Sequence, residues 1–241
     1  MIEKKNSYIW FNSKISDSLT NKISVKLYDK LTLDYNKYKN INNHSYKLND
    51  LVYCILLRYE TLNSGGHQWG IPLPIKDMFK DKFNINFEMF ASSLNHYYDY
   101  YCSMFYDIEK YFMSLGQFHN IKYIRGFYMA NPPYEEKMLN NMFTIMNNSF
   151  TNNKNKLSFI FGTPTWDTFY FSLHDKIKSS KYYVFSHRFN DYQVKWYDFT
   201  QNKYETIPSS TRYVISNDKN IDVDGLKSII FNWINLKINK I

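Results

Sequence analysis

The 241-residue chain lacks any long apolar run. No segment approaches the roughly 18 consecutive apolar residues that a membrane-spanning helix needs. The first ten residues, MIEKKNSYIW, also lack the apolar block of a signal peptide. We therefore expect a soluble, intracellular protein of the nucleus or cytoplasm, or of a viral factory or virion, that is not secreted and has no membrane partner.

Cysteine is scarce, with two residues, Cys54 and Cys102, both in apolar segments. Neither stands at metal-ligand spacing, so we expect buried free thiols in a reducing compartment rather than a disulfide or a zinc site. Five of the six histidines are candidates, and they show no ligand spacing and no paired nucleophile either: His67, His96, His119, His174 and His187. The sequence predicts no metal site.

Acidic residues are fewer than basic ones, 22 against 30, which gives a net charge of +8. An excess of positive charge favours a polyanionic partner through counterion release. The 23 Tyr and 19 Phe could stack on bases. Both features are also what the codon usage of an AT-rich genome produces, so they indicate nucleic acid only weakly.

Strands and helices alternate from about residue 70 onward, which predicts an α/β protein with a doubly wound, Rossmann-like sheet. The expected strands are 85–90, a segment near 102–107, 126–130, 157–162, 182–186 and 212–216. The expected helices are 75–83, 95–101, 134–146 and 225–238, and the polar segment 196–210 reads as a loop. In such a sheet, ligands bind beyond the carboxyl ends of the strands.

The first 65 residues read as a short N-terminal helical extension, and residues 66–241 as the Rossmann-like domain. Apolar residues recur every four positions in this extension, as on one face of a helix: Ile15, Leu19, Ile23, Leu27 and Leu31. The segment 51–62, LVYCILLRYETL, predicts a second, buried helix that ends at Ser64-Gly65-Gly66.

The segment Asn131-Pro132-Pro133-Tyr134 follows the predicted strand 126–130 and precedes an amphipathic helix. The Asn131 amide oxygen and the Pro132 carbonyl are two acceptors that can hold one NH2 group with its lone pair free to attack. Tyr134 offers a flat face on which a planar amide or base stacks. N-methylation of an exocyclic amine or amide requires this orientation of a weak nucleophile. A plain strand-ending turn remains the alternative.

A longer pattern surrounds this motif: EMFASSLN at 88–95, YCSMF at 101–105, Asp107, YF at 111–112, Ser114, Gly116 and then NPPY. It resembles the methyltransferase domain of the cap-specific adenosine N6-methyltransferases, the family of the phosphorylated-CTD-interacting factor. There the pattern reads E-C-F-A-S-P-L-N, Y-C-S-x-F, D, Y-F, S, G and N-P-P-F. The resemblance spans roughly residues 50 to 218. It implies a class I fold that uses S-adenosyl-L-methionine and modifies RNA, with 5′-capped mRNA as the expected partner.

The resemblance also implies roles for single residues. The cofactor would be bound by Gln68, Glu88, Phe90, Ala91, Ser92, Leu94, Asn95, Asp107, Glu109 and Asn131. Asp107 would bind the ribose hydroxyls, with Glu109 as a nearby substitute. Asn131, Pro132, Pro133 and Tyr134 would hold the adenine amino group and the base. Trp166 and Arg188 are the further candidates for substrate contact, Arg188 through phosphate.

Departures from the family pattern affect two loops and the N-terminal region. The animal member of the family carries a WW domain and a larger helical domain that helps hold the cap, whereas only about 50 residues precede the matching block here, so the acceptor stays open. Ser93 stands where the family has proline, and Met113 where it has glycine. The alternatives are an N6-adenine methyltransferase acting on DNA or uncapped RNA, and a non-catalytic RNA-binding relative. A protein partner that supplies cap or RNA recognition also remains open.

Overall fold

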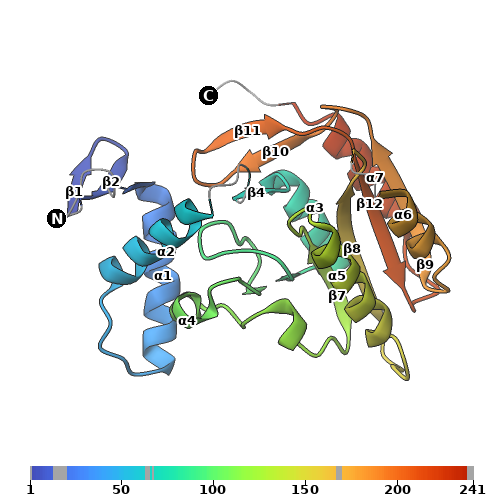
Figure 1. The fold of residues 1–241 in the computed structure, drawn as a ribbon, viewed down its shortest axis with the longest axis horizontal. Helices are drawn as coiled ribbons and strands as arrows, with labels where there is room; N and C mark the ends of the chain where they lie inside the picture. Colours follow the sequence, from blue (N-terminus) through green and yellow to red (C-terminus); the bar gives the residue numbers. More distant parts are fainter. Residues whose placement is uncertain (1, 13–20, 63–65, 67, 167–169, 238–241) are drawn as a thin grey trace.

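The computed structural model describes residues 2–12, 21–62, 66, 68–166 and 170–237. A large part of the molecule is built around a six-stranded sheet. A smaller N-terminal part carries its own three-stranded sheet and two long helices (Figure 1). The described helices include none that is both long and apolar enough to cross a bilayer.

The six-stranded sheet has the order β6-β5-β7-β8-β12-β9. Its strands are β5 (Phe87–Glu88), β6 (Tyr100–Tyr101), β7 (Gly126–Ala130), β8 (Leu157–Pro164), β9 (Tyr183–Phe189) and β12 (Ser210–Ser216). β6, β5, β7 and β8 run parallel, while β12 is antiparallel to both β8 and β9. The predicted α/β class is confirmed, with a mixed sheet.

Helices cover both faces of this sheet (Figure 1). One face packs against α5 (Glu136–Ser149) and α6 (Tyr170–Lys178), and the other against α3 (Leu73–Phe83) and α7 (Val223–Ile234). Successive strand residues point to opposite faces. In β8, Phe159 and Phe161 enter the first core and Ile160 enters the second.

A second sheet has three strands in the order β11-β10-β4. It joins β4 (Trp69–Gly70) to the hairpin of β10 (Lys195–Asp198) and β11 (Lys203–Thr206). The prediction of a polar loop over 196–210 was therefore wrong. Trp196 and Asp198 are buried while Tyr197 is less so, an alternation that is typical of a half-buried strand.

The N-terminal part contains β1 (Ile2–Lys5), β2 (Tyr8–Phe11), β3 (Asn21–Ser24), α1 (Val25–Ile41) and α2 (Leu48–Thr61). The expected extension was purely helical, but Ile23 lies in β3, where it pairs with Ile9. Ile15 and Leu19 lie outside the described residues. Leu27 and Leu31 do share the buried face of α1.

Two further local predictions were wrong. Residues 95–99 form the end of a turn, an irregular stretch and a bend rather than a helix, because the backbone N–H groups of Tyr97 and Tyr98 donate to the Glu88 carboxylate. Cys54 is exposed on α2, whereas Cys102 is buried and burial raises its pKa to about 12. The connection to β7 contains three short helices: α4 (Tyr106–Glu109), η2 (Lys110–Phe112) and η3 (Phe118–Asn120).

Candidate functional site

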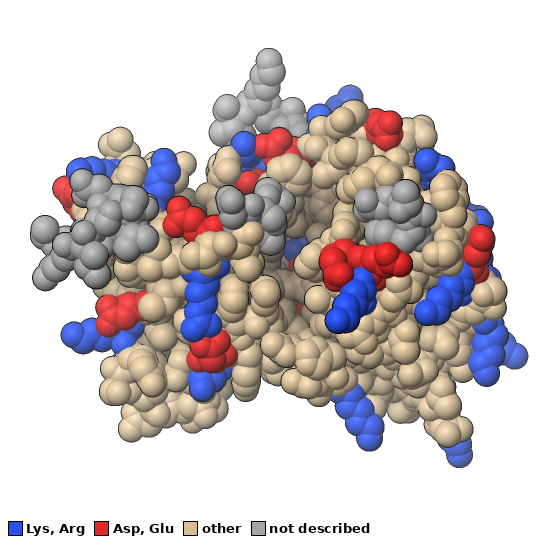
Figure 2. All heavy atoms as spheres, viewed as in Figure 1, with Lys and Arg blue, Asp and Glu red and all other residues tan. Residues whose placement is uncertain are grey.

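Two loops meet at the carboxyl edge of the parallel strands. The segment 90–95 follows β5, and Asn131–Tyr134 follows the neighbouring strand β7. Glu88 is paired with Met129 across these strands, and the Met89 N–H donates to the Met129 carbonyl at 2.8 Å. The molecule is hollowed between the N-terminal part and the sheet (Figure 2). The structure thus brings together the two motifs that the sequence singled out.

Asn131 is held at both ends of its amide. Its Oδ1 accepts a hydrogen bond from Arg212 Nη2 at 3.0 Å, and its Nδ2 donates to the Trp69 carbonyl at 3.4 Å. Arg212 lies in β12 and is only 1% exposed. Sequence reasoning missed this residue, although an arginine within the apolar strand 212–216 was a signal that could have found it.

Tyr134 and Trp166 form the aromatic side of the site. Their ring centroids are 5.5 Å apart, with the rings inclined by 64°. The Tyr134 hydroxyl end is buried beside Ser210 and Arg212, and burial raises its pKa. Trp166 is 46% exposed. An exposed ring next to a partly buried one leaves an aromatic surface on which a base can stack.

Pro132 is buried, Pro133 is exposed, and the helix that follows begins without a proline in its first turn. Glu135 instead caps α5 by accepting hydrogen bonds from the N–H groups of Lys137 and Met138. The Pro132 carbonyl accepts no hydrogen bond from the residues that the structure describes. The sequence predicts this carbonyl as a second acceptor for a ligand, and that role stays a prediction.

Ser92 organises the loop after β5. Its Oγ donates to Gln68 Oε1 at 2.6 Å and accepts from the N–H groups of Leu94 and Asn95. Its own N–H donates to Asn95 Oδ1 at 2.7 Å. The buried Gln68 Nε2 has no partner within the described chain. Hydrogen bonds thus hold the loop, and the neighbouring Gln68 side chain has a donor without a partner among the described residues.

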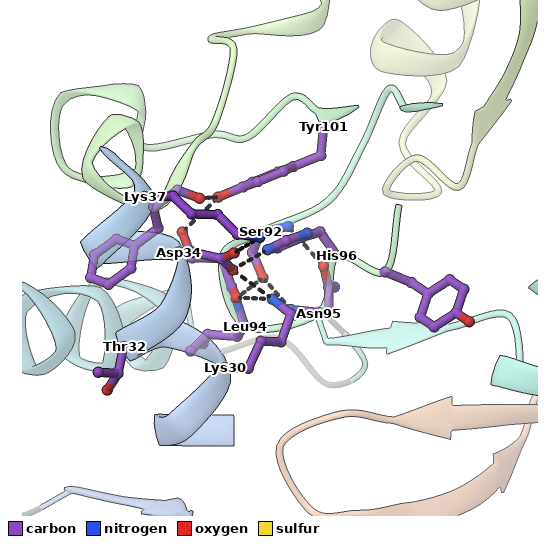
Figure 3. Close-up of polar contacts among 12 residues, drawn as sticks. Lys30, Thr32, Asp34, Lys37, Ser92, Leu94, Asn95, His96 and Tyr101 are labelled. Atoms are coloured by element: carbon purple, nitrogen blue, oxygen red, sulfur yellow. Dashed lines mark hydrogen bonds and ion pairs between the residues drawn. The ribbon is translucent and has the colours of Figure 1, made fainter. Parts of the chain in front are cut away.

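The first helix of the N-terminal part supports this loop (Figure 3). Lys30 Nζ donates to the Ser93 carbonyl at 3.1 Å, and Asp34 Oδ2 lies 3.0 Å from His96 Nε2. His96 also stacks on Tyr101, with ring centroids 4.0 Å apart. Burial, followed by the charge of Lys30, lowers the pKa of His96, although Asp34 acts in the opposite direction. Burial lowers the pKa of Lys30 to about 8.

Two of the predicted cofactor-binding residues lie beneath the loop. Glu88 is 6% exposed, forms an ion pair with Lys76 at 2.5 Å and accepts the two backbone N–H groups noted above. Phe90 packs on Phe118 with ring centroids 4.4 Å apart, and the adjacent Ala91 N–H donates to the Cys102 carbonyl. The Glu88 carboxylate is therefore already occupied by protein donors.

The two acidic candidates for the ribose contact differ in environment. Asp107 is exposed at the start of α4, where it forms an ion pair with Arg58 at 2.7 Å. Glu109 is fully buried and accepts hydrogen bonds from Tyr59 Oη and from the N–H groups of Ser93 and Phe105. Burial raises the pKa of Glu109, although these donors act against the shift. Asp107 is the more accessible carboxylate.

The two departures from the family pattern have local consequences here. Ser93 donates its backbone N–H to Glu109 at 2.7 Å, a bond that proline cannot make. Met113 adopts φ 73°, in the left-handed region that glycine favours.

Arg188 is not brought to the motif. It is exposed on β9, paired with Thr211 of β12, so three strand spacings, roughly 14 Å, separate its strand from β7. Within the described residues, no three His, Cys, Asp or Glu side chains gather as metal ligands would.

The fold is that of an α/β protein in which Asn131–Tyr134 and the loop after β5 stand at the carboxyl edge of the parallel strands. The family model described as "Phosphorylated CTD interacting factor 1 WW domain" matches residues 25–198, from the first residue of α1 to the last of β10. The chain belongs to this family.

Curated relatives in two mammals support the assignment. The chain is 31% identical over 152 residues to the Homo sapiens "mRNA (2'-O-methyladenosine-N(6)-)-methyltransferase", and 30% identical to the Mus musculus protein of the same name. Each match covers 60% of this chain and 21% of the relative, so the chain spans about a fifth of the length of these relatives. It is thus distantly related to an mRNA methyltransferase.

Proposed function

We propose that the chain is an S-adenosyl-L-methionine-dependent RNA adenosine N6-methyltransferase that acts on the cap-proximal 2′-O-methyladenosine of mRNA. The observation that carries the proposal is the position of Asn131-Pro132-Pro133-Tyr134. The motif stands at the carboxyl end of β7, beside the bonded loop that follows β5. The relatives' printed names give the acceptor.

A Rossmann-like reading of the fold is part of the proposal. Parallel strands with helices on both faces, and site loops at the carboxyl edge, are what a doubly wound fold requires. In this reading residues 66–241 form the methyltransferase unit. Residues 1–65 form an extension whose helix α1 supports the cofactor loop through Lys30 and Asp34.

The residues present suit the cofactor. Gln68 Nε2 is a buried donor without a partner in the described chain, and a carboxylate or an adenine nitrogen of the cofactor is an acceptor that would satisfy it. Phe90, Ala91, Ser92, Leu94 and Asn95 would line the site, and Asp107 would hold the ribose once it exchanges Arg58 for the hydroxyls. When bound, the cofactor supplies the sulfonium methyl group.

The protein's task at the acceptor is orientation. The Asn131 oxygen has a second lone pair, and the Pro132 carbonyl accepts nothing from the described residues. Together they would hold the adenine amino group by its two N–H bonds, while Tyr134 and Trp166 stack on the base. The lone pair of the amino nitrogen takes no part in these two hydrogen bonds and would be free to face the methyl group of the cofactor. Such a base has to be unstacked, which costs least at an RNA 5′ end.

Mass spectrometry of nucleosides tests the proposal directly. Capped RNA that begins with 2′-O-methyladenosine is incubated with the protein and cofactor, beside uncapped RNA and DNA of the same sequence. We expect N6-methylation in the capped sample. Methylation of only the DNA or the uncapped RNA would show that the acceptor is an adenine of that nucleic acid and not the cap-proximal adenosine. Binding of S-adenosylhomocysteine without transfer to any sample would identify a non-catalytic relative.

The variant Asn131→Ala isolates the motif. We expect it to lower methyl transfer at least 100-fold, because the amino group loses its acceptor, while the affinity for S-adenosylhomocysteine in calorimetry changes only a few-fold. Transfer at the wild-type rate by this variant would rule out the assigned role of Asn131.

A further inference from the structure

Arg212 reaches Asn131 across an intervening strand. The register pairs Arg212 of β12 with Gly162 of β8, and Phe161 of β8 with Ala130 of β7. Asn131 is therefore level with Gly162. A Cβ placed on Gly162 would lie 2.3 Å from Arg212 Nη1, which is closer than a Cβ and a non-bonded heavy atom approach in proteins. The missing side chain at position 162 is what lets the guanidinium extend from β12 to the motif.

The guanidinium is buried, and none of the described residues supplies a counter-charge to it. No carboxylate in the described parts of the chain lies within 4.0 Å of it, and its Nε has no hydrogen-bond partner. It rests instead on two indole rings, 4.8 Å from the centroid of Trp196 and 5.3 Å from that of Trp233. Burying an unpaired cation costs free energy, so stability alone does not account for this residue.

The two contacts of Asn131 fix which way its amide points. Arg212 offers only N–H donors, and the Trp69 carbonyl is only an acceptor. A flipped amide would bring two donors together at Arg212 and two acceptors together at Trp69. The arrangement therefore keeps the Asn131 oxygen on the Arg212 side.

We infer that Arg212, admitted by Gly162, is a positioning residue that locks the Asn131 amide for the incoming amino group. This inference rests on the proposed function. Without Arg212 the amide can flip and present its NH2 group to another NH2 group, which repels the substrate. Because Arg212 acts through Asn131, its effect should appear in the transfer step and should vanish where Asn131 is absent.

Single-turnover kinetics on the full chain, with capped RNA and cofactor saturating, test the role. We expect Arg212→Gln to slow transfer roughly 100-fold, with the Kd for S-adenosylhomocysteine changed less than 3-fold. Arg212→Lys, which keeps a donor, should recover part of the rate, and Gly162→Ala should slow transfer although Arg212 is present. Arg125→Gln, exposed at the opposite end of β7, is the control. In an Asn131→Ala background, Arg212→Gln should have no further effect. A full additional loss there, or a wild-type rate for Arg212→Gln, would overturn the inference.

Nuclear magnetic resonance separates this inference from the proposed function. The side-chain NH2 signals of Asn131 are identified by their absence in Asn131→Ala. We expect these protons to exchange slowly in the wild type and markedly faster in Arg212→Gln and Gly162→Ala. Unchanged exchange would overturn the Arg212 contact whatever the activity. Changed exchange in a wild-type protein that methylates no adenosine would retain the contact and reject the proposed function.

Discussion

Glu88 is a buried charged residue close to the site, and its hydrogen bonds and ion pair determine its pKa. Its pKa would be raised by burial, but Lys76 and the N–H groups of Tyr97 and Tyr98 outweigh burial and hold the pKa below its ordinary value of 4.5. A depressed carboxyl pKa stabilises the fold above the ordinary value, and the contribution is lost as the pH falls through the depressed value. The Glu88 carboxylate thus fixes the segment that contains Tyr97 and Tyr98.

Removing the partner of Glu88 provides the test. In Lys76→Met the carboxylate stays buried without its counter-charge, so we expect a loss of about 3 kcal/mol or more in the free energy of unfolding by urea at pH 7. Adding Glu88→Gln to that variant should recover part of the loss. Lys80→Met, exposed on the same helix, should change stability by less than about 0.5 kcal/mol. Equal effects of the two lysine variants would contradict this role of the ion pair.

At the scale of elements, the sequence predicted best where one periodicity dominates. The strand 126–130 was confirmed residue for residue. The predicted apolar stripe of α5 is buried at Leu139, Met142, Phe143 and Met146 and partly buried at Met138. Tertiary contacts decided the rest. The segment 95–99 is not helical because the Glu88 carboxylate accepts hydrogen bonds from the N–H groups of Tyr97 and Tyr98. The β10–β11 hairpin forms because β10 pairs with β4, which lies 125 residues or more earlier in the chain.

The site divides in the same way. The NPPY motif and the loop after β5 lie next to each other because parallel strands present their carboxyl ends at one edge, and a reading of the strands foresaw that. An arginine in an apolar strand marks Arg212 as unusual, but its contact with Asn131 could not be foreseen, because that contact depends on an antiparallel register with Gly162 that the local sequence does not specify. The same holds for Lys30 and Asp34, whose partners lie over 60 residues away.

The contact between α1 and the loop predicts a dependence on pH. The lowered pKa of His96 means that the unfolded chain takes up a proton more readily than the folded chain. Stability from this residue is therefore full above the ordinary value of 6.5 and is lost as the pH falls from there toward the depressed value. The groups facing the ring are Asp34 and Lys30 from α1 and Glu88 from β5.

We expect the melting temperature to fall between pH 6.5 and pH 5, and His96→Gln to flatten that slope. Glutamine retains a donor toward Asp34 but does not titrate. His119→Gln, at an exposed position in η3, should keep the wild-type slope. The same slope in all three proteins would show that His96 does not contribute.

Leu94 connects the loop after β5 to the N-terminal part of the molecule. This side chain of the loop after β5 is 1% exposed and belongs to the apolar core of the N-terminal part, together with Ile108 and Phe112. The N-terminal part is therefore packed against the site rather than appended to it. The match to the family model, which begins at the first residue of α1, includes most of this part.

A matched pair of leucines distinguishes a support of the site from an ordinary core residue. Leu226 of α7 is equally buried, in the core between the six-stranded sheet and helices α3 and α7. Each Leu→Ala change should cost about 3 kcal/mol in the free energy of unfolding, from lost burial and the cavity left behind. Measured well below either melting temperature, only Leu94→Ala should weaken S-adenosylhomocysteine binding, by roughly 10-fold, because it loosens the loop that Ser92 organises. If both variants bind like the wild type, the N-terminal part contributes stability but does not shape the cofactor site.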